Sequence, residues 1–240
     1  MISTIWSHWH FPSFSHWVVV FPLGLLLGIS IGWGTGILKH KWNLPVGYSR
    51  KIFHFAIFTL AGLLGLVGGF PAVQVFGTAI GVVVVYAVWQ GESSKLYQAV
   101  ARPSDAPYER FYILVPFLMT ALGGMVSNLC FGEMALIGYI TTGWGDAVGE
   151  PAGTRWGKHK YRAPSLRGVI TYRSWEGSLA VFLASLVGCV VLLSSTFPAP
   201  LGWTLTAATL LALCTTLVEA LTFHSMDNLT IQVATSALGY

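Results

Sequence analysis

The sequence predicts an all-α membrane protein: a polytopic bundle of about seven transmembrane helices with a short C-terminal segment and the N-terminus outside. Its composition indicates this class, since 54% of the 240 residues are hydrophobic and only 9% are charged. A typical soluble domain has about 25% charged residues. The same balance excludes a disordered chain, a collagen and a coiled coil. We expect a single membrane-embedded catalytic domain over residues 1–240, because spanning segments must pack against one another.

Apolar runs of roughly 17 to 25 residues, the length that crosses a bilayer, recur along the chain. They cover residues 17–38, 52–69, 71–89, 111–131, 134–152, 177–197 and 201–223. A last run, 228–240, is too short to span, and we expect a partial or re-entrant helix there. Three cysteines, Cys130, Cys189 and Cys214, lie within apolar runs without a C-x-x-C pair, which favours packing residues over disulfides or zinc ligands.

The N-terminal segment is rich in aromatic residues and histidines. They are Trp6, His8, Trp9, His10, His16 and Trp17. Such residues are typical of the interface between membrane and water, and their spacing does not favour a metal site. No Lys or Arg precedes Lys39, so the segment does not resemble a secretory signal.

The basic residues occupy alternate connections between the predicted spans. They are Lys39, Lys41, Arg50 and Lys51; Lys95, Arg102 and Arg110; and Arg155, Lys158, Lys160, Arg162, Arg167 and Arg173. Basic loops stay on the cytoplasmic side, which predicts a multi-pass protein of the inner cell membrane with its N-terminus outside. These loops also account for the net charge of +4, so we expect no nucleic-acid partner.

Ionisable residues gather at the same inner end of the spans. Asp146, Glu150 and Glu219 lie within predicted spans, with His54 and Asp227 at the same depth. Charged groups inside a membrane are costly and usually functional. Each could alternatively reach water as an interfacial side chain. Their common depth favours a site that opens to the cytoplasm.

A glycine-rich stretch follows Gly145 and leads into cations. The glycines, spaced every four residues, are Gly145, Gly149, Gly153 and Gly157, and the cations are Arg155, Lys158, Lys160 and Arg162. Open backbone beside cations suits a polyphosphate, and nearby carboxylates suit Mg²⁺ bound with it. The alternative for the glycines is close helix packing without a ligand. No Walker A motif is present, which excludes a P-loop fold.

Four blocks in order resemble the dolichol kinase and phytol kinase family of polytopic membrane enzymes. They are Arg50-Lys51-Ile52-Phe53-His54, Gly145-Asp146 through Gly157-Lys158, Arg173-Ser174-Trp175-Glu176-Gly177-Ser178, and Asp227-Asn228-Leu229-Thr230 with Glu219 upstream. Two residues depart from the family pattern: Met226 replaces the first Asp of the last block, and Gln232 replaces a proline that commonly follows it.

The resemblance implies a membrane kinase that transfers the γ-phosphate of CTP to a lipid alcohol, such as phytol, farnesol or a polyprenol, at the cytoplasmic face. It implies Asp146 as a catalytic residue, with His54 or Glu219 as the base. The implied Mg²⁺ ligands are Asp146, Glu150 and Asp227. The implied nucleotide contacts are Arg50, Lys51, Gly149, Gly153, Arg155, Gly157, Lys158, Lys160, Ser174 and Asn228.

Several alternatives stay open at this stage. A phosphatidate-type cytidylyltransferase would use nearly the same residues to make a CDP-lipid. A transporter is a further alternative, although the two halves show no repeat and the polar residues lie at one face only. Ser174 and Glu176 also fit a helix cap, and Asn228-Leu229-Thr230 fits a glycosylation acceptor. The expected partners are a nucleoside triphosphate, the lipid alcohol and membrane lipids, with a homodimer left open.

Overall fold

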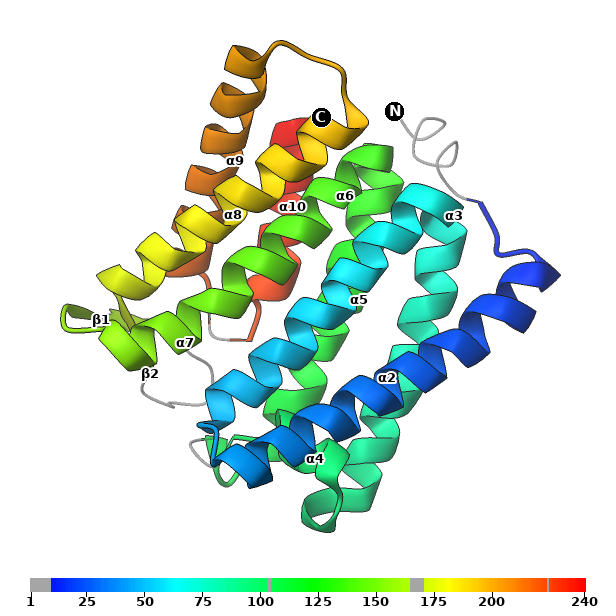
Figure 1. Cartoon of the computed structure of the whole chain (residues 1–240), viewed down its shortest axis with the longest axis vertical. Coiled ribbons are helices and arrows are strands. Elements are labelled where there is room, and N and C mark those ends of the chain that lie inside the picture. The colour runs from blue at the N-terminus through cyan, green and yellow to red at the C-terminus, as the bar shows by residue number, and fades with distance from the viewer. Residues whose placement is uncertain (1–9, 103–104, 165–170, 224) are drawn as a thin grey trace.

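The computed structural model describes residues 10–102, 105–164, 171–223 and 225–240, and its described part is almost entirely helical (Figure 1). The α-helices are α2 Phe14–Trp42, α3 Val46–Gln90, α4 Lys95–Val100, α5 Glu109–Phe131, α6 Ala135–Ile140, α7 Ala147–Trp156, α8 Trp175–Thr196, α9 Leu201–Leu221 and α10 Asp227–Gly239. Short 3-10 turns cover Gly91–Ser93 and Gly132–Met134, and a π-helix, η4, covers Thr141–Asp146. The predicted all-α class is confirmed.

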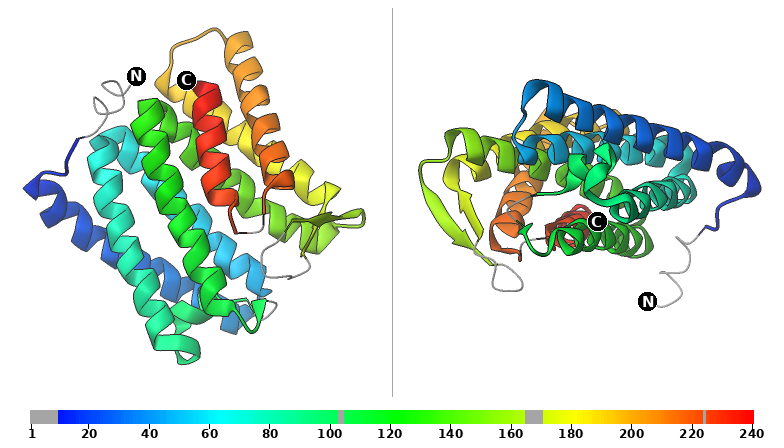
Figure 2. Two further views of the ribbon diagram at one scale, coloured as in Figure 1. Left: turned by 180° about the vertical axis from the view of Figure 1, so that it is seen from behind. Right: turned by 90° about the horizontal axis from the view of Figure 1, so that it is seen from below.

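Five helical segments of the described chain are long and apolar enough to cross a membrane. They are Phe14–Trp42, Gly47–Ser93, Glu109–Trp156, Trp175–Thr196 and Leu201–Leu221. The second and third have 47 and 48 residues, about twice the ~20 residues that one crossing needs. Each contains a glycine with positive φ, Gly69 at 64° and Gly132 at 55°, where the chain turns back (Figures 1 and 2). The count of seven crossings and the outside N-terminus stay predictions.

A glycine stripe on α2 explains how closely this helix packs on α3. A Cβ atom at Gly24 would lie 2.8 Å from the Ala79 Cβ, and one at Gly28 would lie 2.8 Å from the Ile80 Cδ1. Small residues four apart let helix backbones approach one another in an apolar environment. The stripe therefore holds α2 against the second half of α3.

The connection between α7 and α8 is a two-stranded antiparallel hairpin, which the sequence analysis did not predict. Strand β1, Lys160–Ala163, pairs with β2, Thr171–Ser174, in the register Lys160↔Ser174. The Tyr161 and Ser178 hydroxyls lie 2.7 Å apart and join the hairpin to α8. Arg167, one of the predicted loop cations, lies outside the described residues.

The N-terminal aromatic segment is described only from His10 onward, so Trp6, His8 and Trp9 lie outside the described residues. Ser13 caps α2, and its backbone N–H donates to Nδ1 of His16 at 3.1 Å. His16 therefore stabilises the start of this helix.

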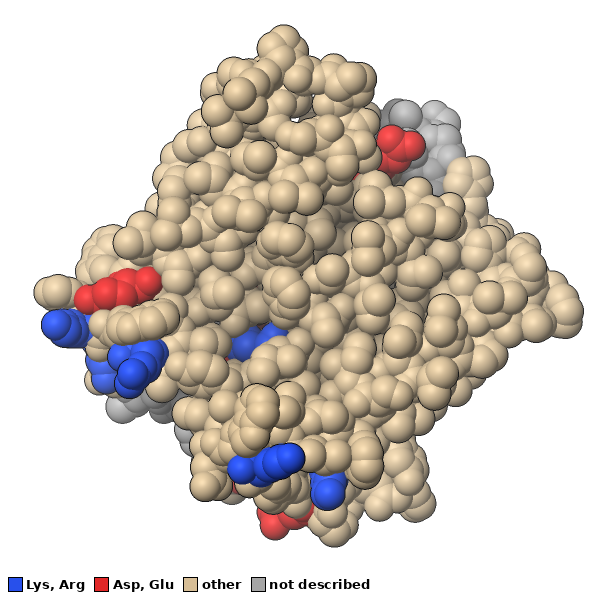
Figure 3. Space-filling view, in the orientation of Figure 1, with Lys and Arg blue, Asp and Glu red and all other residues tan. Residues whose placement is uncertain are grey.

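Charged side chains are concentrated at one end of the molecule. In Figure 3, Lys and Arg cluster over the β1–β2 end and along the lower edge, whereas most of the remaining surface is uncharged. Large hydrophobic side chains are exposed along the helices between the two ends, including Leu63 at 54% and Val187 at 54% exposure. This pattern fits a helical bundle surrounded by lipid.

Candidate active site

A cavity of about 420 Å³ lies at the charged end of the bundle, between the start of α3, α7, the hairpin and the start of α10. Ten charged residues line it: Arg50, Lys51, Arg102, Lys160 and Arg173, with Asp105, Asp146, Glu150, Glu219 and Asp227. We call this space the charged cavity. It brings together residues from all four sequence blocks.

Lys51, His54 and Asp146 form the centre of one wall. Nζ of Lys51 donates to Oδ2 of Asp146 at 2.7 Å, and Nε2 of His54 lies 3.5 Å from the same oxygen. Nε2 of His54 also lies 3.1 Å from the Thr142 carbonyl oxygen. Because a carbonyl oxygen only accepts, Nε2 carries the hydrogen in this contact, and Nδ1 is the free acceptor of a neutral ring. Lys51 and Asp146 are both buried, with 6% exposure each.

The π-helix η4 sets the position of Asp146. A Cβ atom at Gly143 would lie 2.3 Å from Cβ of Phe58, and one at Gly145 would lie 2.2 Å from Oγ of Ser185. The two glycines thus let one turn pack closely against both α3 and α8. π-turns inside α-helices are frequently found at functional sites. Asp146 ends this turn and faces Lys51.

Arg102 holds a second group of charges. Its Nη1 lies 3.1 Å from Oε1 of Glu150, and its Nε lies 3.6 Å from Oδ2 of Asp105. Burial raises the pKa of the Asp105 carboxyl above its usual value, while the positive charges of Arg102 and Arg50 oppose this rise. Arg102 was not among the predicted site residues, although its position in a basic loop was noted.

Arg173, on β2, holds the third group. Its Nε lies 2.6 Å from Oε1 of Glu219, and its Nη2 lies 3.6 Å from Oδ2 of Asp227. Its Nη1 donates to the backbone carbonyls of Ala220 and Thr222 at 3.2 and 3.0 Å. One guanidinium therefore ties the hairpin to α9 and α10. Arg173 begins the third sequence block but was not predicted as a site residue.

The predicted glycines have both of the roles considered from sequence. Gly149, Gly153 and Gly157 line the charged cavity. A Cβ atom at Gly149 would also lie 2.7 Å from Cγ2 of Val181, so this stripe packs on α8 as well. Ser174 caps α8, since its Oγ accepts from the Gly177 N–H at 3.1 Å, and it also lines the cavity.

The cations near the end of α7 that the sequence predicts as nucleotide contacts do not all line the charged cavity. Lys160 lines the charged cavity. Arg155 and Lys158 are exposed and are absent from its lining. The cations that do face the cavity come from α3, from the segment after α4 and from the hairpin. Spacing along α7 does not reveal them, because they are contributed by other elements.

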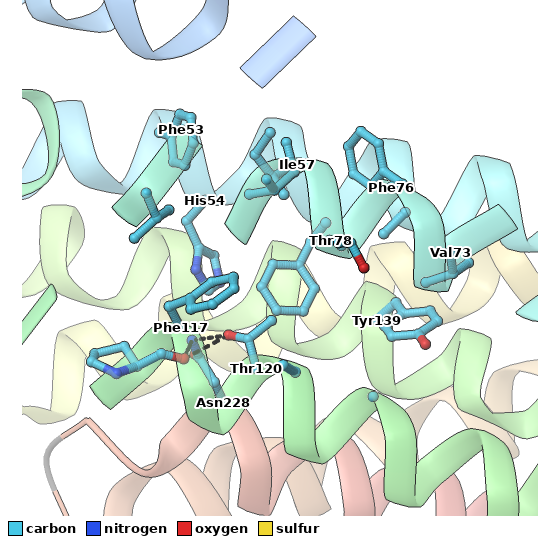
Figure 4. Close-up of a pocket in the computed structure, with 18 of the residues that line it drawn as sticks. Phe53, His54, Ile57, Val73, Phe76, Thr78, Phe117, Thr120, Tyr139 and Asn228 are labelled. Carbon is cyan, nitrogen blue, oxygen red and sulfur yellow. Dashed lines mark hydrogen bonds between the residues drawn. The ribbon is translucent and has the colours of Figure 1, made fainter. Parts of the chain in front are cut away.

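A second, mostly apolar cavity of about 500 Å³ adjoins the first, and Arg50 lines both. Figure 4 shows His54 and Asn228 at one end of it and Val73 and Tyr139 toward the other. Asn228 is only 4% exposed, and its Nδ2 donates to Oγ1 of Thr120 at 2.7 Å. Because this side chain is buried, it is a poor acceptor for glycosylation. Asp227 faces the charged cavity and Asn228 the apolar one.

Among the described residues, no group of three or more His, Cys, Asp or Glu side chains is arranged to hold a metal ion by itself. Asp146, Glu150 and Asp227 nevertheless line the same cavity. Mg²⁺ needs only one or two carboxylates when phosphate oxygens and waters complete its shell. This set of carboxylates therefore fits a metal that arrives with a nucleotide.

Comparison with known proteins finds a similar chain of assigned activity. A phytol kinase from Synechocystis sp. is 29% identical to this chain over 239 residues, which cover 91% of this chain and 94% of the relative. No protein-family model matches the chain, and no solved structure does. The match confirms the family resemblance that the four sequence blocks predict.

Proposed function

We propose that this chain transfers the γ-phosphate of CTP to the hydroxyl of a lipid alcohol, because it is similar to a phytol kinase along 91% of its length. One observation carries this proposal: a charged cavity and an apolar cavity meet at Arg50, beside His54 and Asp146. A kinase for lipid alcohols needs a polar site for the triphosphate next to an apolar site for the tail.

The charged cavity has unused capacity for phosphate oxygens. Nη1 of Arg50 and Nε of Arg102 are buried and have no hydrogen-bond partner among the described residues. Buried polar groups are nearly always paired, so these two donors are open to an acceptor; the 3.6 Å from Arg102 Nε to Asp105 Oδ2 is longer than a hydrogen bond. Phosphate oxygens are acceptors with the charge that guanidinium groups bind best. Arg50, Arg102 and Lys160 are the proposed triphosphate contacts, and Gly149 and Gly153 leave room for the nucleotide.

Mg²⁺ bound with the nucleotide would be held by Asp146 and Asp227, with Glu150 nearby, and would neutralise charge on the phosphates. Asp146 already contacts Lys51 and His54. Lys51 would then contact a phosphate oxygen as well as the carboxylate. The protein's own contribution is thus to position the phosphates and to place positive charge around them.

His54 is the proposed general base. It lines the apolar cavity, whereas Glu219 lines the charged cavity and is paired with Arg173. The Thr142 carbonyl orients the ring, so Nδ1 is free to take a proton. The alcohol oxygen forms a bond to the γ-phosphorus, the bond from that phosphorus to the β–γ bridging oxygen breaks, and CDP leaves. The hydroxyl proton passes to Nδ1 of His54.

We place the reaction in a multi-pass membrane protein of the inner membrane, with the charged cavity facing the cytoplasm. The basic side chains support this orientation, because they gather at the end that contains the cavity (Figure 3). CTP is available on that side.

The test is an assay of purified protein in lipid nanodiscs with phytol, farnesol or diacylglycerol and each of CTP, ATP, GTP and UTP. The proposal expects CDP and a phosphorylated alcohol, with CTP preferred. Pyrophosphate and a CDP-lipid formed from phosphatidate would instead establish the cytidylyltransferase. Absence of transfer to every alcohol tested, by protein that is monodisperse and folded, would overturn the kinase proposal.

A further inference from the structure

The apolar cavity is long and runs along the bundle. Its lining extends from Phe70 to Val84 on the second half of α3 and from Tyr112 to Met125 on α5. At 1.5 Å per helical residue, both stretches measure about 20 Å. That is more than half of the ~30 Å thickness of a bilayer's hydrocarbon core. A volume of about 500 Å³ also lies within the range of small-molecule sites, roughly 300–1,000 Å³.

The charged groups of the cavity lie at one end only. Arg50, His54 and Asn228 occur where it meets the charged cavity, and the rest of the lining is mostly apolar, with the uncharged polar side chains of Gln74, Thr78, Thr120 and Tyr139 as exceptions (Figure 4). The Thr120 hydroxyl is already bonded to Asn228. This distribution suits a molecule with one hydroxyl at its end and a hydrocarbon chain behind it.

The same cavity reaches the surface between α3 and α5. Four of its lining residues are exposed: Gly77, Thr78, Ala121 and Met125. A Cβ atom built on Gly77 meets nothing within 4 Å, so the space beside it is open. One turn away, a Cβ at Gly81 would lie 2.7 Å from Cζ of Phe117, which marks where the two helices close.

The surface around this opening is hydrocarbon. Leu118 is 52% exposed, Leu122 40% and Val82 48%. Gly77 lies eight residues after the turn at Gly69, a distance of about 12 Å along the helix. The opening is therefore on the lateral, apolar flank of the bundle, at a depth where acyl chains surround it.

We propose that the hydrocarbon tail of the alcohol enters from the bilayer between Gly77 and Ala121 and lies in this cavity, with its hydroxyl at His54. The inference rests on the proposed function for the identity of the occupant. It adds a tail site, a lateral entrance and a glycine that keeps this entrance open. A molecule bound in this way never leaves the membrane, and its hydroxyl reaches the nucleotide from the apolar side.

The test makes the same Gly→Phe substitution at two positions of the fold. Gly77→Phe fills the entrance, whereas Gly202→Phe adds the same ring at an exposed glycine of α9 that also has no atoms within 4 Å of a Cβ. We expect Gly77→Phe to lower kcat/KM for phytol by roughly tenfold or more, with the KM for CTP unchanged. Gly202→Phe should behave as wild type. Equal phytol turnover by the two variants would overturn the entrance.

A binding measurement separates this inference from the kinase assignment. Hexadecanol carrying a mid-chain diazirine is irradiated with the full-length protein in nanodiscs, and labelled peptides are mapped by mass spectrometry. We expect labels on residues 71–84 and 111–125, lost in Gly77→Phe and kept in Gly202→Phe. Labels confined to other surfaces would refute the tail site even if the protein is a kinase, and cavity labels unchanged in Gly77→Phe would refute the entrance. Labels in the cavity without phosphoryl transfer would refute the proposed function and leave the site standing.

Discussion

The two cavities that meet at Arg50 are held by different forces. Ion pairs between distant segments form the walls of the charged cavity, such as Lys51–Asp146 and Arg173–Glu219. Close packing of side chains forms the walls of the apolar cavity, as at Gly81 and Phe117. Removing one partner of a buried ion pair leaves the other charge unpaired, which is strongly destabilising. An apolar wall, in contrast, tolerates the replacement of one hydrophobic side chain by another of similar volume. The charged cavity should therefore be much more sensitive to substitution than the apolar cavity.

The largest loss of stability is expected for Arg173→Ala. The change leaves Glu219 and Asp227 without their cation and leaves the Ala220 and Thr222 carbonyls without a donor. Removing one partner of a buried pair costs about 3–5 kcal/mol of unfolding free energy. Thermal unfolding in detergent measures it, with the exposed Arg162→Ala of the same hairpin as control. An unchanged melting temperature would show that these pairs do not hold the hairpin.

The next effect in size is expected for Asp146→Asn. It keeps the shape of the side chain but removes the charge that faces Lys51 and His54. Turnover should fall by roughly 10²–10³, while labelling of the apolar cavity by the diazirine alcohol stays normal. The control is Glu133→Gln, an exposed acid outside both cavities. Full turnover by Asp146→Asn would remove Asp146 from the proposed mechanism.

His54→Gln tests the role of the histidine that lies where the two cavities meet. We expect turnover to fall by roughly 10²-fold with the KM for CTP unchanged, because a base acts on the alcohol and not on nucleotide binding. His159→Gln, at an exposed histidine that contacts Glu176, is the matched control. A raised KM for CTP at constant kcat would place His54 in nucleotide binding instead.

The smallest effect is expected on the KM for CTP, when Lys160→Ala is compared with Lys158→Ala. Lys160 lines the charged cavity and Lys158 does not. We expect Lys160→Ala to raise the KM for CTP by roughly fivefold. Lys158→Ala should change the KM for CTP by less than about twofold, since an ion pair between this exposed lysine and the nucleotide would contribute little to binding. Equal effects would support both lysines as nucleotide contacts, as the family resemblance implies. Titration of initial rates against CTP measures both.

Much of the fold was predictable because hydropathy is a local property. The separate runs 52–69 and 71–89 correspond to the two halves of α3, which turn at Gly69. The run 228–240 matches α10, Asp227–Gly239. The hairpin and the π-helix were not predicted. The π-turn lies where Gly143 approaches Phe58 and Gly145 approaches Ser185, and no local pattern encodes these approaches between distant segments.

The candidate site was predicted in part. The blocks around His54 and Asp146 do converge, although 95 positions separate Lys51 from Asp146. Arg102 and Arg173 were missed as site residues because a cation in a loop shows its partner only after folding. Gln232, which departs from the family pattern, is fully buried, and its Nε2 donates to the Thr120 carbonyl at 3.3 Å. It joins α10 to α5, beside the residues that orient Asn228.

By itself the sequence determined that the chain is a helical membrane bundle with its charges at one end, because apolar runs and basic loops are sorted residue by residue between lipid and water. Only the tertiary structure decided which carboxylate meets which cation, and that the space beside His54 is a long apolar cavity. Those features depend on contacts between helices far apart in the chain. Burial makes the pairing of these charges strict, because an unpaired charge in the interior has no water to solvate it.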